Sequence, residues 1–311
     1  MSASKSMSPY WQYFVVSFLS IFALRYVSSS SIPLPAQALL DVCRTADQPN
    51  PIASLYPANA TGTLNGTIAV LPIPLTLARQ LVPSKYRILE HAYQHLLPSF
   101  AKDMYPLFVQ TLHDHEVQAF GFQIPDFSRA GVEFPFLDLL GDNTTSFKWV
   151  PSLLMSAGNE IALAGAANYG IKVYPATFDP VCDAYRAVPD AQQAGTTFAG
   201  AKSVLDGVAS LATTFATTDE PMFSLNFFKN VTNQVVFSDG KVCDNMIRLF
   251  DTNVTTSPNR IDSVVGSVKI NMFPFAKEQE WQAVHGLRLD TAFIENNYLP
   301  CENFRGYGTS E

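Results

Sequence analysis

Two pairs of histidines have spacings that suit metal binding. His91 and His95 are four residues apart, on one face of a helix, while His113 and His115 are two apart, on one face of a strand. Either pair could supply two ligands, but a zinc site needs further ligands that the sequence does not locate. We therefore predict no metal site and interpret residues 113–115 as the polar end of a strand.

Three charged residues in largely apolar surroundings could carry acid–base or amine chemistry. If Ile171 and Val173 face one way along a strand, Lys172 faces the other, either into a cavity as a reactive amine or into solvent. Glu133, in VEFPF, is a candidate general acid or base, or an exposed carboxylate. Arg129, in FSRAG, could bind a substrate carboxylate, although this segment has the character of a turn.

The overall composition excludes two classes of protein. Hydrophobic residues make up 47% of the 311 residues and charged residues 15%, which is incompatible with disorder. Lysine and arginine number 20 against 27 acidic residues, for a net charge of −7, and no basic stripe is present to bind nucleic acid. The sequence contains no GxGxxG, P-loop, GxSxG or HExxH, and no cofactor is predicted.

The hydrophobic patterns predict mainly strands. TIAVLPI, residues 67–73, predicts a buried strand, and residues 75–83 predict a helix that ends at its proline. Residues 86–98 are compatible with another helix. Strands at roughly ten-residue spacing are predicted from 104 to 178 and again after 220, followed by a short helix at 276–284 and a last strand. This spacing favours a sandwich or a barrel over alternating βαβ units.

The chain divides into a leader, an irregular lead-in at 32–64 and a single domain at 65–311. Within the domain, residues 188–218 are rich in Ala, Thr and Gly. This stretch predicts either a helix with one apolar face or a mobile insertion, and we treat it as an embellishment of the domain.

Residues 1–31 predict entry into the secretory pathway. The apolar run at 10–24 would span about 22 Å as a helix, less than the roughly 30 Å of a bilayer core. Its length and the small residues Ser28–Ser31 favour a cleaved signal peptide, with an uncleaved anchor or a buried helix as alternatives. The protein is thus expected to be secreted or lumenal, or held on a membrane by this segment.

Cysteines and glycosylation sequons agree with that compartment. The cysteines are even in number and widely spaced: Cys43, Cys182, Cys243 and Cys301. They predict one or two long-range disulfides of open connectivity, the alternative being buried thiols. The candidate N-glycosylation sites are Asn59, Asn65, Asn143, Asn230 and Asn253. They modestly exceed the roughly two or three sequons expected by chance.

Several segments together resemble the acetoacetate decarboxylase-like superfamily. They are VLPIPLTLARQLVP, NEIALAGAANYGIKVYPATF, KVCDNMIRLFDTNVTT and PFAKEQEWQAVHGLRLDTAFIE, and they follow the superfamily's order over roughly residues 65–295. The resemblance implies a mainly β fold, a closed antiparallel β-barrel or cone with outer helices and an interior active site. Fungal secondary-metabolite clusters include relatives of this superfamily, and the predicted signal and sequons suit a eukaryotic source, so we expect a fungal protein.

In the decarboxylases of that superfamily, a lysine forms an imine with the substrate ketone, and the imine accepts electrons as CO2 leaves. The resemblance places Lys172 in that role, with Glu133 and Arg129 as pocket residues. The superfamily has two adjacent lysines, but here Ile171 replaces one of them. Residues 164–167, Ala-Gly-Ala-Ala, stand where an Arg-Glu pair is expected, which would enlarge the pocket.

The resemblance implies a carbon–carbon lyase that acts on a β-keto or polyketide-type acid in fungal secondary metabolism. One alternative keeps the fold without imine chemistry and makes the protein a cyclase, dehydratase or isomerase for a hydrophobic intermediate. The other is a non-enzymatic small-molecule carrier. In each case the partner is a small molecule, and the oligomeric state is left open.

Overall fold

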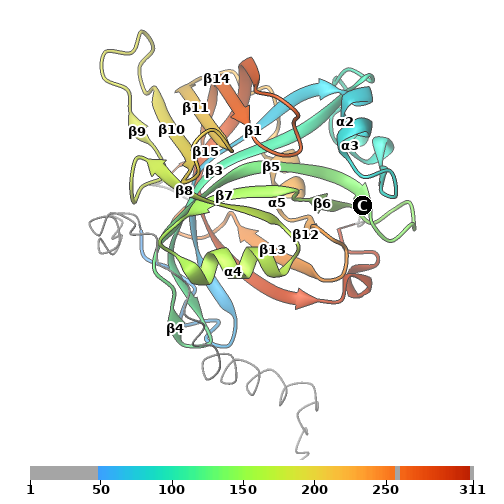
Figure 1. The fold of residues 1–311 in the computed structure, drawn as a ribbon, viewed down its shortest axis with the longest axis horizontal. Coiled ribbons are helices and arrows are strands. Elements are labelled where there is room, and N and C mark those ends of the chain that lie inside the picture. The colour runs from blue at the N-terminus through green and yellow to red at the C-terminus, as the bar shows by residue number, and fades with distance from the viewer. Residues whose placement is uncertain (1–47, 256–259, 309–311) are drawn as a thin grey trace, which may run out of the picture. The chain divides into compact units, whose positions relative to one another are not determined.

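The computed structural model describes residues 48–255 and 260–308. The strands are β1 (Ala60–Pro74), β2 (Arg87–Ile88), β3 (Met104–Ala119), β4 (Phe122–Gln123), β5 (Phe127–Asp138), β6 (Phe147–Trp149), β7 (Ser152–Ser156), β8 (Lys172–Asp179), β9 (Arg186–Ala187), β10 (Thr197–Ser203), β11 (Ser210–Thr217), β12 (Val235–Phe237), β13 (Cys243–Leu249), β14 (Asp262–Asn271) and β15 (Gln279–Leu299). The helices are α2 (Leu75–Leu81), α3 (Glu90–Leu96), α4 (Glu160–Asn168), α5 (Leu225–Thr232) and the short 3-10 helix η1 (Cys301–Phe304). The fold is mainly β with flanking helices, as predicted (Figure 1).

The strands close into two rings that share one wall. The shared wall is β15–β1–β3–β5. One ring, which we call the smaller barrel, runs from β5 through β6, β12 and β13 back to β15. The other, the larger barrel, runs from β5 through β7, β8, β10, β11 and β14 back to β15. Most pairs are antiparallel, but β6–β12 and β7–β8 are parallel.

The shared wall sends alternate side chains into the two barrels. Successive residues of a strand point to opposite faces, so Gln110 and Asp114 of β3 face one barrel and Thr111 the other. Gln110 contacts residues of β5 and β13 inside the smaller barrel, whereas Thr111 and Ser128 line a space against β10 in the larger one. The wall is therefore buried on both faces, which explains the long buried runs of β1 and β3.

Helix α5 packs on the interior of the smaller barrel. The Ser224 side chain accepts a hydrogen bond from the backbone N–H of Phe227 and caps the start of the helix. The rings of Phe227 and Phe228 each lie 5.7 Å, centroid to centroid, from that of Phe108 on β3. These aromatic contacts fix the end of α5, which lies against the charged residues described below.

Three of the predicted elements differ from the structure. Residues 188–218 are neither a helix nor an embellishment, because β10 and β11 form a hairpin that completes the larger barrel. The segment predicted as a short helix at 276–284 forms the start of β15, where its backbone pairs with β14. Part of the segment predicted as strands before 178 is helix α4. Its start is capped by Asn159, whose side chain accepts from the Ala162 N–H.

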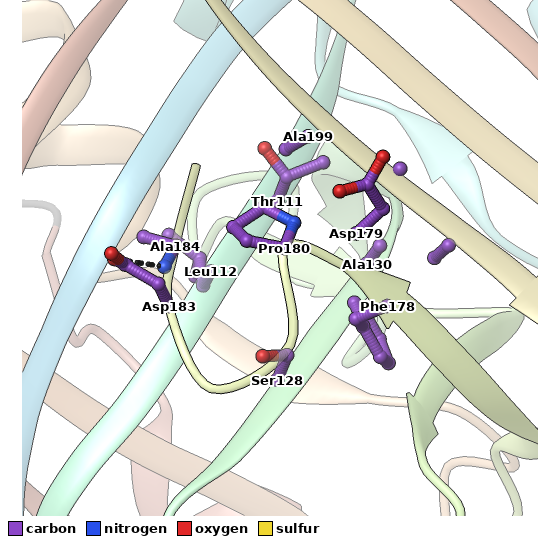
Figure 2. A pocket seen from close by; sticks show the side chains of 12 residues that line it. Thr111, Leu112, Ser128, Ala130, Phe178, Asp179, Pro180, Asp183, Ala184 and Ala199 are labelled. Carbon is purple, nitrogen blue, oxygen red and sulfur yellow. Dashed lines mark hydrogen bonds between the residues drawn. The ribbon is translucent and has the colours of Figure 1, made fainter. Parts of the chain in front are cut away.

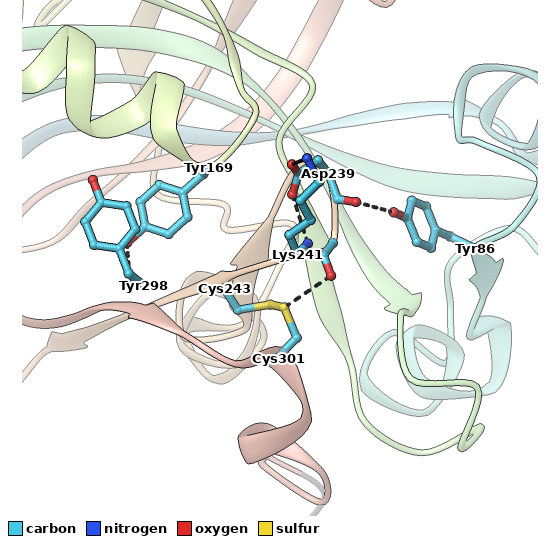
Figure 3. Close-up of a disulfide and its surroundings, with 8 residues drawn as sticks. Tyr86, Tyr169, Asp239, Lys241, Cys243, Tyr298 and Cys301 are labelled. Atoms are coloured by element: carbon cyan, nitrogen blue, oxygen red, sulfur yellow. Dashed lines mark hydrogen bonds and ion pairs between the residues drawn. A yellow bond between two sulfur atoms is a disulfide. The ribbon is translucent and has the colours of Figure 1, made fainter. Parts of the chain in front are cut away.

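A disulfide confirms part of the cysteine prediction. Cys243, the first residue of β13, is bonded to Cys301 of η1, 58 residues later (Figure 3). Cys182 is also disulfide-bonded, and Cys43 lies outside the described residues. The Cys243–Cys301 bond ties the start of β13 to the C-terminal part of the described chain.

The predicted leader at 1–31 and most of the lead-in lie outside the described residues. Residues 48–59 form turns before β1 begins at Ala60. Among the helices that the structure describes, none is both long and apolar enough to cross a membrane.

The five sequons differ in exposure. Asn143 and Asn253 are exposed, and Asn59 and Asn230 are half-buried. Asn65 is buried within β1, at 9% exposure, where it pairs in register with His113 and Asp290. A glycan on Asn65 is therefore incompatible with the folded chain. The sequence TLNGT has the character of a turn, but it lies in the middle of a strand that both barrels cover.

Candidate functional site

Charged side chains from five strands meet inside the smaller barrel. We call this group the interior cluster; it consists of Gln110, Asp114, Arg129, Glu133, Lys148, Asp244, Arg248 and Glu295. Buried charges are rare unless they are paired, so such a group inside a barrel is a candidate functional site.

Lys148 and Glu133 form the innermost ion pair. The Lys148 ammonium lies 3.0 Å from a carboxylate oxygen of Glu133 and donates to the carbonyl oxygen of Thr232, at 3.1 Å. Thr232 is the last residue of α5, where the helix dipole presents negative charge to the ammonium. Strand β6 and helix α5 thus hold the amine between a carboxylate and a helix end.

The barrel interior perturbs both members of the pair. Burial lowers the pKa of the Lys148 ammonium; Glu133 opposes this effect, and the positive charge of Arg248 adds to it. Burial alone would raise the pKa of Glu133, but the neighbouring Lys148 holds it below its usual range. A lysine with a lowered pKa is closer to the neutral amine that attacks a carbonyl group.

A hydrogen-bonded chain continues from this pair to an arginine. The Gln110 amide donates to Glu133 at 2.8 Å, and its carbonyl oxygen accepts from Arg248 Nη2 at 3.3 Å. Burial, together with the charge of Arg129, lowers the pKa of Arg248 to about 10. Arg248 Nη1 is buried and finds no hydrogen-bond acceptor among the described residues. This guanidinium nitrogen is available to bind an anion such as a carboxylate.

A second ion pair lies at the more open side of the cluster. Arg129 Nε is 3.1 Å from an oxygen of Asp114, and Arg129 Nη2 donates to the Met246 sulfur at 3.5 Å. Burial raises the pKa of Asp114 to about 6, although Arg129 opposes the rise. The Arg129 side chain keeps 15% exposure, the most of the four ion-paired residues of the cluster.

Asp244 and Glu295 supply a carboxyl pair from β13 and β15. Burial raises the pKa of Asp244 well above its usual range, and the charge of Glu295 and a hydrogen bond between the two side chains raise it further. A raised pKa keeps a proton on this carboxyl pair to higher pH than on a free carboxyl group, so the pair is a candidate proton donor.

The innermost groups are almost completely buried. The side chains of Lys148 and Glu133 keep only 5% and 8% exposure. Gln110 joins them to the Arg248 guanidinium through its two hydrogen bonds.

The structure brings two of the three sequence-predicted site residues into this cluster. Glu133 and Arg129 both lie on β5, four residues apart and on the same face. Lys172 lies outside the cluster, because it is the first residue of β8 and is exposed. Its ammonium is 5.1 Å from the ring centre of Tyr174 and 5.5 Å from that of Phe273. An exposed lysine lacks the desolvation that favours a neutral amine.

Sequence reasoning missed Lys148 and the β13 pair of Asp244 and Arg248. Lys148 lies between Phe147 and Trp149, and a single charge between two bulky apolar residues was a usable signal of burial. Asp244 and Arg248 share one face of β13 with Met246, a spacing of two that the sequence CDNMIR shows.

The larger barrel has a small pocket at its shared wall. A pocket of about 10 Å³ lies between Thr111 and Ser128 on one side and the segment around Pro180 and Asp183 on the other (Figure 2). That volume accepts about one water molecule, so the pocket is too small for a substrate as it stands. The Ser128 hydroxyl lies 2.9 Å from His113 Nδ1 there. In the described part of the chain, no three His, Cys, Asp or Glu side chains are grouped so that they could hold a metal ion.

The known proteins that match this chain are solved structures. No protein-family model and no curated protein matches the chain. An acetoacetate decarboxylase-like enzyme from Sphingomonas wittichii RW1 is similar in structure, with 11% identity over 78% of this chain and 94% of the enzyme, at a TM-score of 0.41. The enduracididine biosynthesis enzyme MppR, solved in complex with pyruvate, shows 10% identity over 76% of this chain and 88% of MppR, at a TM-score of 0.42.

Proposed function

We propose that the chain is an enzyme that processes a keto acid inside the smaller barrel and that Lys148 is its imine-forming amine. The observation that carries the proposal is the environment of Lys148, a buried lysine with a lowered pKa beside Glu133 and a second cation, Arg248. The resemblance to decarboxylases assigned this role to Lys172, but Lys172 is exposed, and the burial of Lys148 favours Lys148 instead.

The cluster contains a group for each step of a decarboxylation. Glu133 accepts the proton of the Lys148 ammonium across their 3.0 Å contact. Arg248, through its unsatisfied Nη1, binds the substrate carboxylate and orients the ketone toward the amine. Asp244, whose pKa is raised by burial and by Glu295, donates a proton late in the reaction.

The steps balance without a cofactor. The neutral Lys148 nitrogen forms a bond with the ketone carbon. The ketone oxygen leaves as water, with one proton from the amine and the one that Glu133 had accepted, to give an iminium ion. The bond between the α-carbon and the carboxylate breaks, CO2 leaves, and the electron pair moves to the iminium nitrogen to give an enamine. Asp244 protonates the enamine carbon, and water then hydrolyses the imine to release the ketone and the free amine.

Turnover of a probe substrate by two matched lysine variants tests the proposal. We would measure CO2 release from acetoacetate and from longer β-keto acids by the wild-type chain, Lys148→Met and Lys172→Met. We expect Lys148→Met to fall to the uncatalysed rate and Lys172→Met to stay within about twofold of wild type, since Lys172 is exposed. Circular dichroism on each variant controls for folding.

The alternatives predict different results in the same assay. If Lys148→Met folds and keeps full turnover, the imine role is wrong, and acid–base catalysis by Glu133 and Asp244 on a hydrophobic intermediate takes its place. If the wild-type chain binds keto acids but releases every one unchanged, the protein is a carrier. A fungal source, a role in secondary metabolism and secretion remain expectations from the sequence.

A further inference from the structure

Four large apolar side chains are exposed together at one rim of the larger barrel. Val204, Leu205 and Val208 lie in the loop between β10 and β11 and are 49%, 69% and 48% exposed. Phe273, in the loop between β14 and β15, is 44% exposed. A hairpin loop of this kind is normally polar, and clustered exposed apolar residues mark an interaction surface.

Two contacts hold these loops against β8. The Val204 N–H donates to the carbonyl oxygen of Pro175 at 2.8 Å. The ammonium of Lys172 lies 5.5 Å from the ring centre of Phe273. The two loops are neighbours, because the start of β11 pairs with the end of β14. The apolar residues and Lys172 therefore share one continuous rim.

Two lysines lie beside these apolar residues: Lys172 next to Phe273, and Lys202 at the end of β10 that leads into the loop. We call the surface the apolar–basic rim; it consists of Lys172, Lys202, Val204, Leu205, Asp206, Val208 and Phe273.

The charge at the rim differs in sign from that of the whole chain. Lys172 and Lys202 are exposed there, against the single exposed carboxylate of Asp206. Lys269 and Glu278, close by, neutralise each other in an ion pair of 3.0 Å. The rim thus carries a small positive excess in a chain whose net charge is −7.

We propose that the apolar–basic rim docks on the surface of an anionic lipid bilayer. Apolar side chains at the tips of loops can enter the boundary between headgroups and acyl chains to a depth of about 5–10 Å. Lysines at the same level keep their ammonium groups among the headgroups and attract anionic lipids. This proposal gives Lys172 a role outside the interior cluster and does not depend on the function proposed above.

Depth-dependent fluorescence quenching in the full-length chain tests the proposal. Leu205→Trp and, as a matched control, Phe122→Trp introduce a tryptophan at two exposed apolar positions, since Phe122 of β4 is 77% exposed but lies outside the rim. Each variant is mixed with vesicles of brominated phosphatidylcholine and phosphatidylglycerol. We expect the added fluorescence of Leu205→Trp to be quenched at least about twofold and that of Phe122→Trp to be unchanged. Any contact made by the leader is common to both variants.

Lipid charge and lysine variants provide the second readout. Binding of the wild-type chain should strengthen as phosphatidylglycerol replaces phosphatidylcholine. Lys172→Gln and Lys202→Gln should each weaken binding to the anionic vesicles by about fivefold and leave binding to pure phosphatidylcholine unchanged. Equal quenching of the two tryptophan variants, or binding that ignores lipid charge, overturns the proposal. Self-association that is lost in Leu205→Ser would assign the rim to a second copy of the chain instead.

Discussion

The interior of the smaller barrel and the rim of the larger barrel each present a lysine between apolar neighbours. Lys148 follows Phe147 and precedes Trp149, and Lys172 lies between Ile171 and Val173. In sequence the two patterns are alike, yet Lys148 is 4% exposed and paired, whereas Lys172 is in solvent. The comparison teaches that the enclosure of a strand, more than its local pattern, decides whether its lysine meets the conditions for amine chemistry.

The shared wall explains the difference. Lys148 on β6 faces Glu133 on β5 across a closed ring that α5 covers at one end. Lys172 begins β8 at the rim of the other ring, beside loops that no helix covers among the described residues. Substitutions of charged groups inside and outside the smaller barrel should therefore change the stability of the protein by different amounts.

Removal of the carboxylate partner of Lys148 should have the largest effect on stability. Glu133→Gln leaves a buried ammonium without its counter-ion, so we expect the free energy of unfolding at pH 7 to fall by about 3–5 kcal/mol. The loss should shrink as the pH is raised, because burial lowers the pKa of the Lys148 ammonium and a neutral amine needs no counter-ion. Urea denaturation over a series of pH values measures this. A loss below about 1 kcal/mol at pH 7 would mean that the smaller barrel is as well solvated as the rim.

Removal of the disulfide should have the second-largest effect on stability. The bond between Cys243 and Cys301 closes a loop of 58 residues and fixes the start of the strand that carries Asp244 and Arg248. From the loop-closure entropy of the unfolded chain, we expect Cys243→Ser with Cys301→Ser to cost about 4 kcal/mol. Thermal and urea unfolding of the double variant measure the cost. An unchanged midpoint would show that β13 needs no covalent tether.

Asp114 should make the stability of the folded protein depend on pH. Burial raises its pKa to about 6, so the folded state binds a proton more tightly than the unfolded state does. The resulting stabilisation is complete below about pH 4 and is lost as the pH rises through about 6. Relative to Asp114→Asn, the wild type should therefore lose about 3 kcal/mol between pH 3.5 and pH 7. Parallel stability curves for the two proteins would contradict the burial of this carboxyl.

An ion pair outside the smaller barrel should have the smallest effect. Asp179 and Arg186 form two hydrogen bonds of 2.9 and 3.0 Å, but their side chains are 55% and 45% exposed. Solvent screens such a pair, so Asp179→Asn should leave the unfolding midpoint unchanged within error. A midpoint that shifts as far as that of Glu133→Gln would remove the distinction between the two regions.

Much of the fold could be predicted from the sequence. The closed, mainly β architecture followed from strands at regular spacing and from the resemblance, and the helix predicted at 75–83 is α2. The prediction failed where tertiary pairing outweighed composition: residues 188–218 are poor in bulky residues, but β10 and β11 pair with β8 and β14. Asn159 was a local signal for the start of α4 that the sequence did contain.

The site was only half predictable, for a physical reason. Glu133 and Arg129 attracted attention as charges near apolar residues, and both belong to the interior cluster. Wall strands such as β3 are buried on both faces, so they lack the polar–apolar alternation that identifies an interior face. Without that alternation, the sequence could not show that Asp114 and His113 enter different barrels, or that Lys148 lies opposite Glu133.

Reductive trapping tests the central claim, that the smaller barrel holds the reactive amine, most directly. The full-length protein is incubated with acetoacetate and sodium borohydride, digested, and mapped by mass spectrometry for a lysine that carries the reduced substrate. We predict that the label is on Lys148, that it disappears in Lys148→Met, and that it persists in Lys172→Met. A label on Lys172, or a wild-type chain that turns over keto acid with no lysine labelled, would contradict this account.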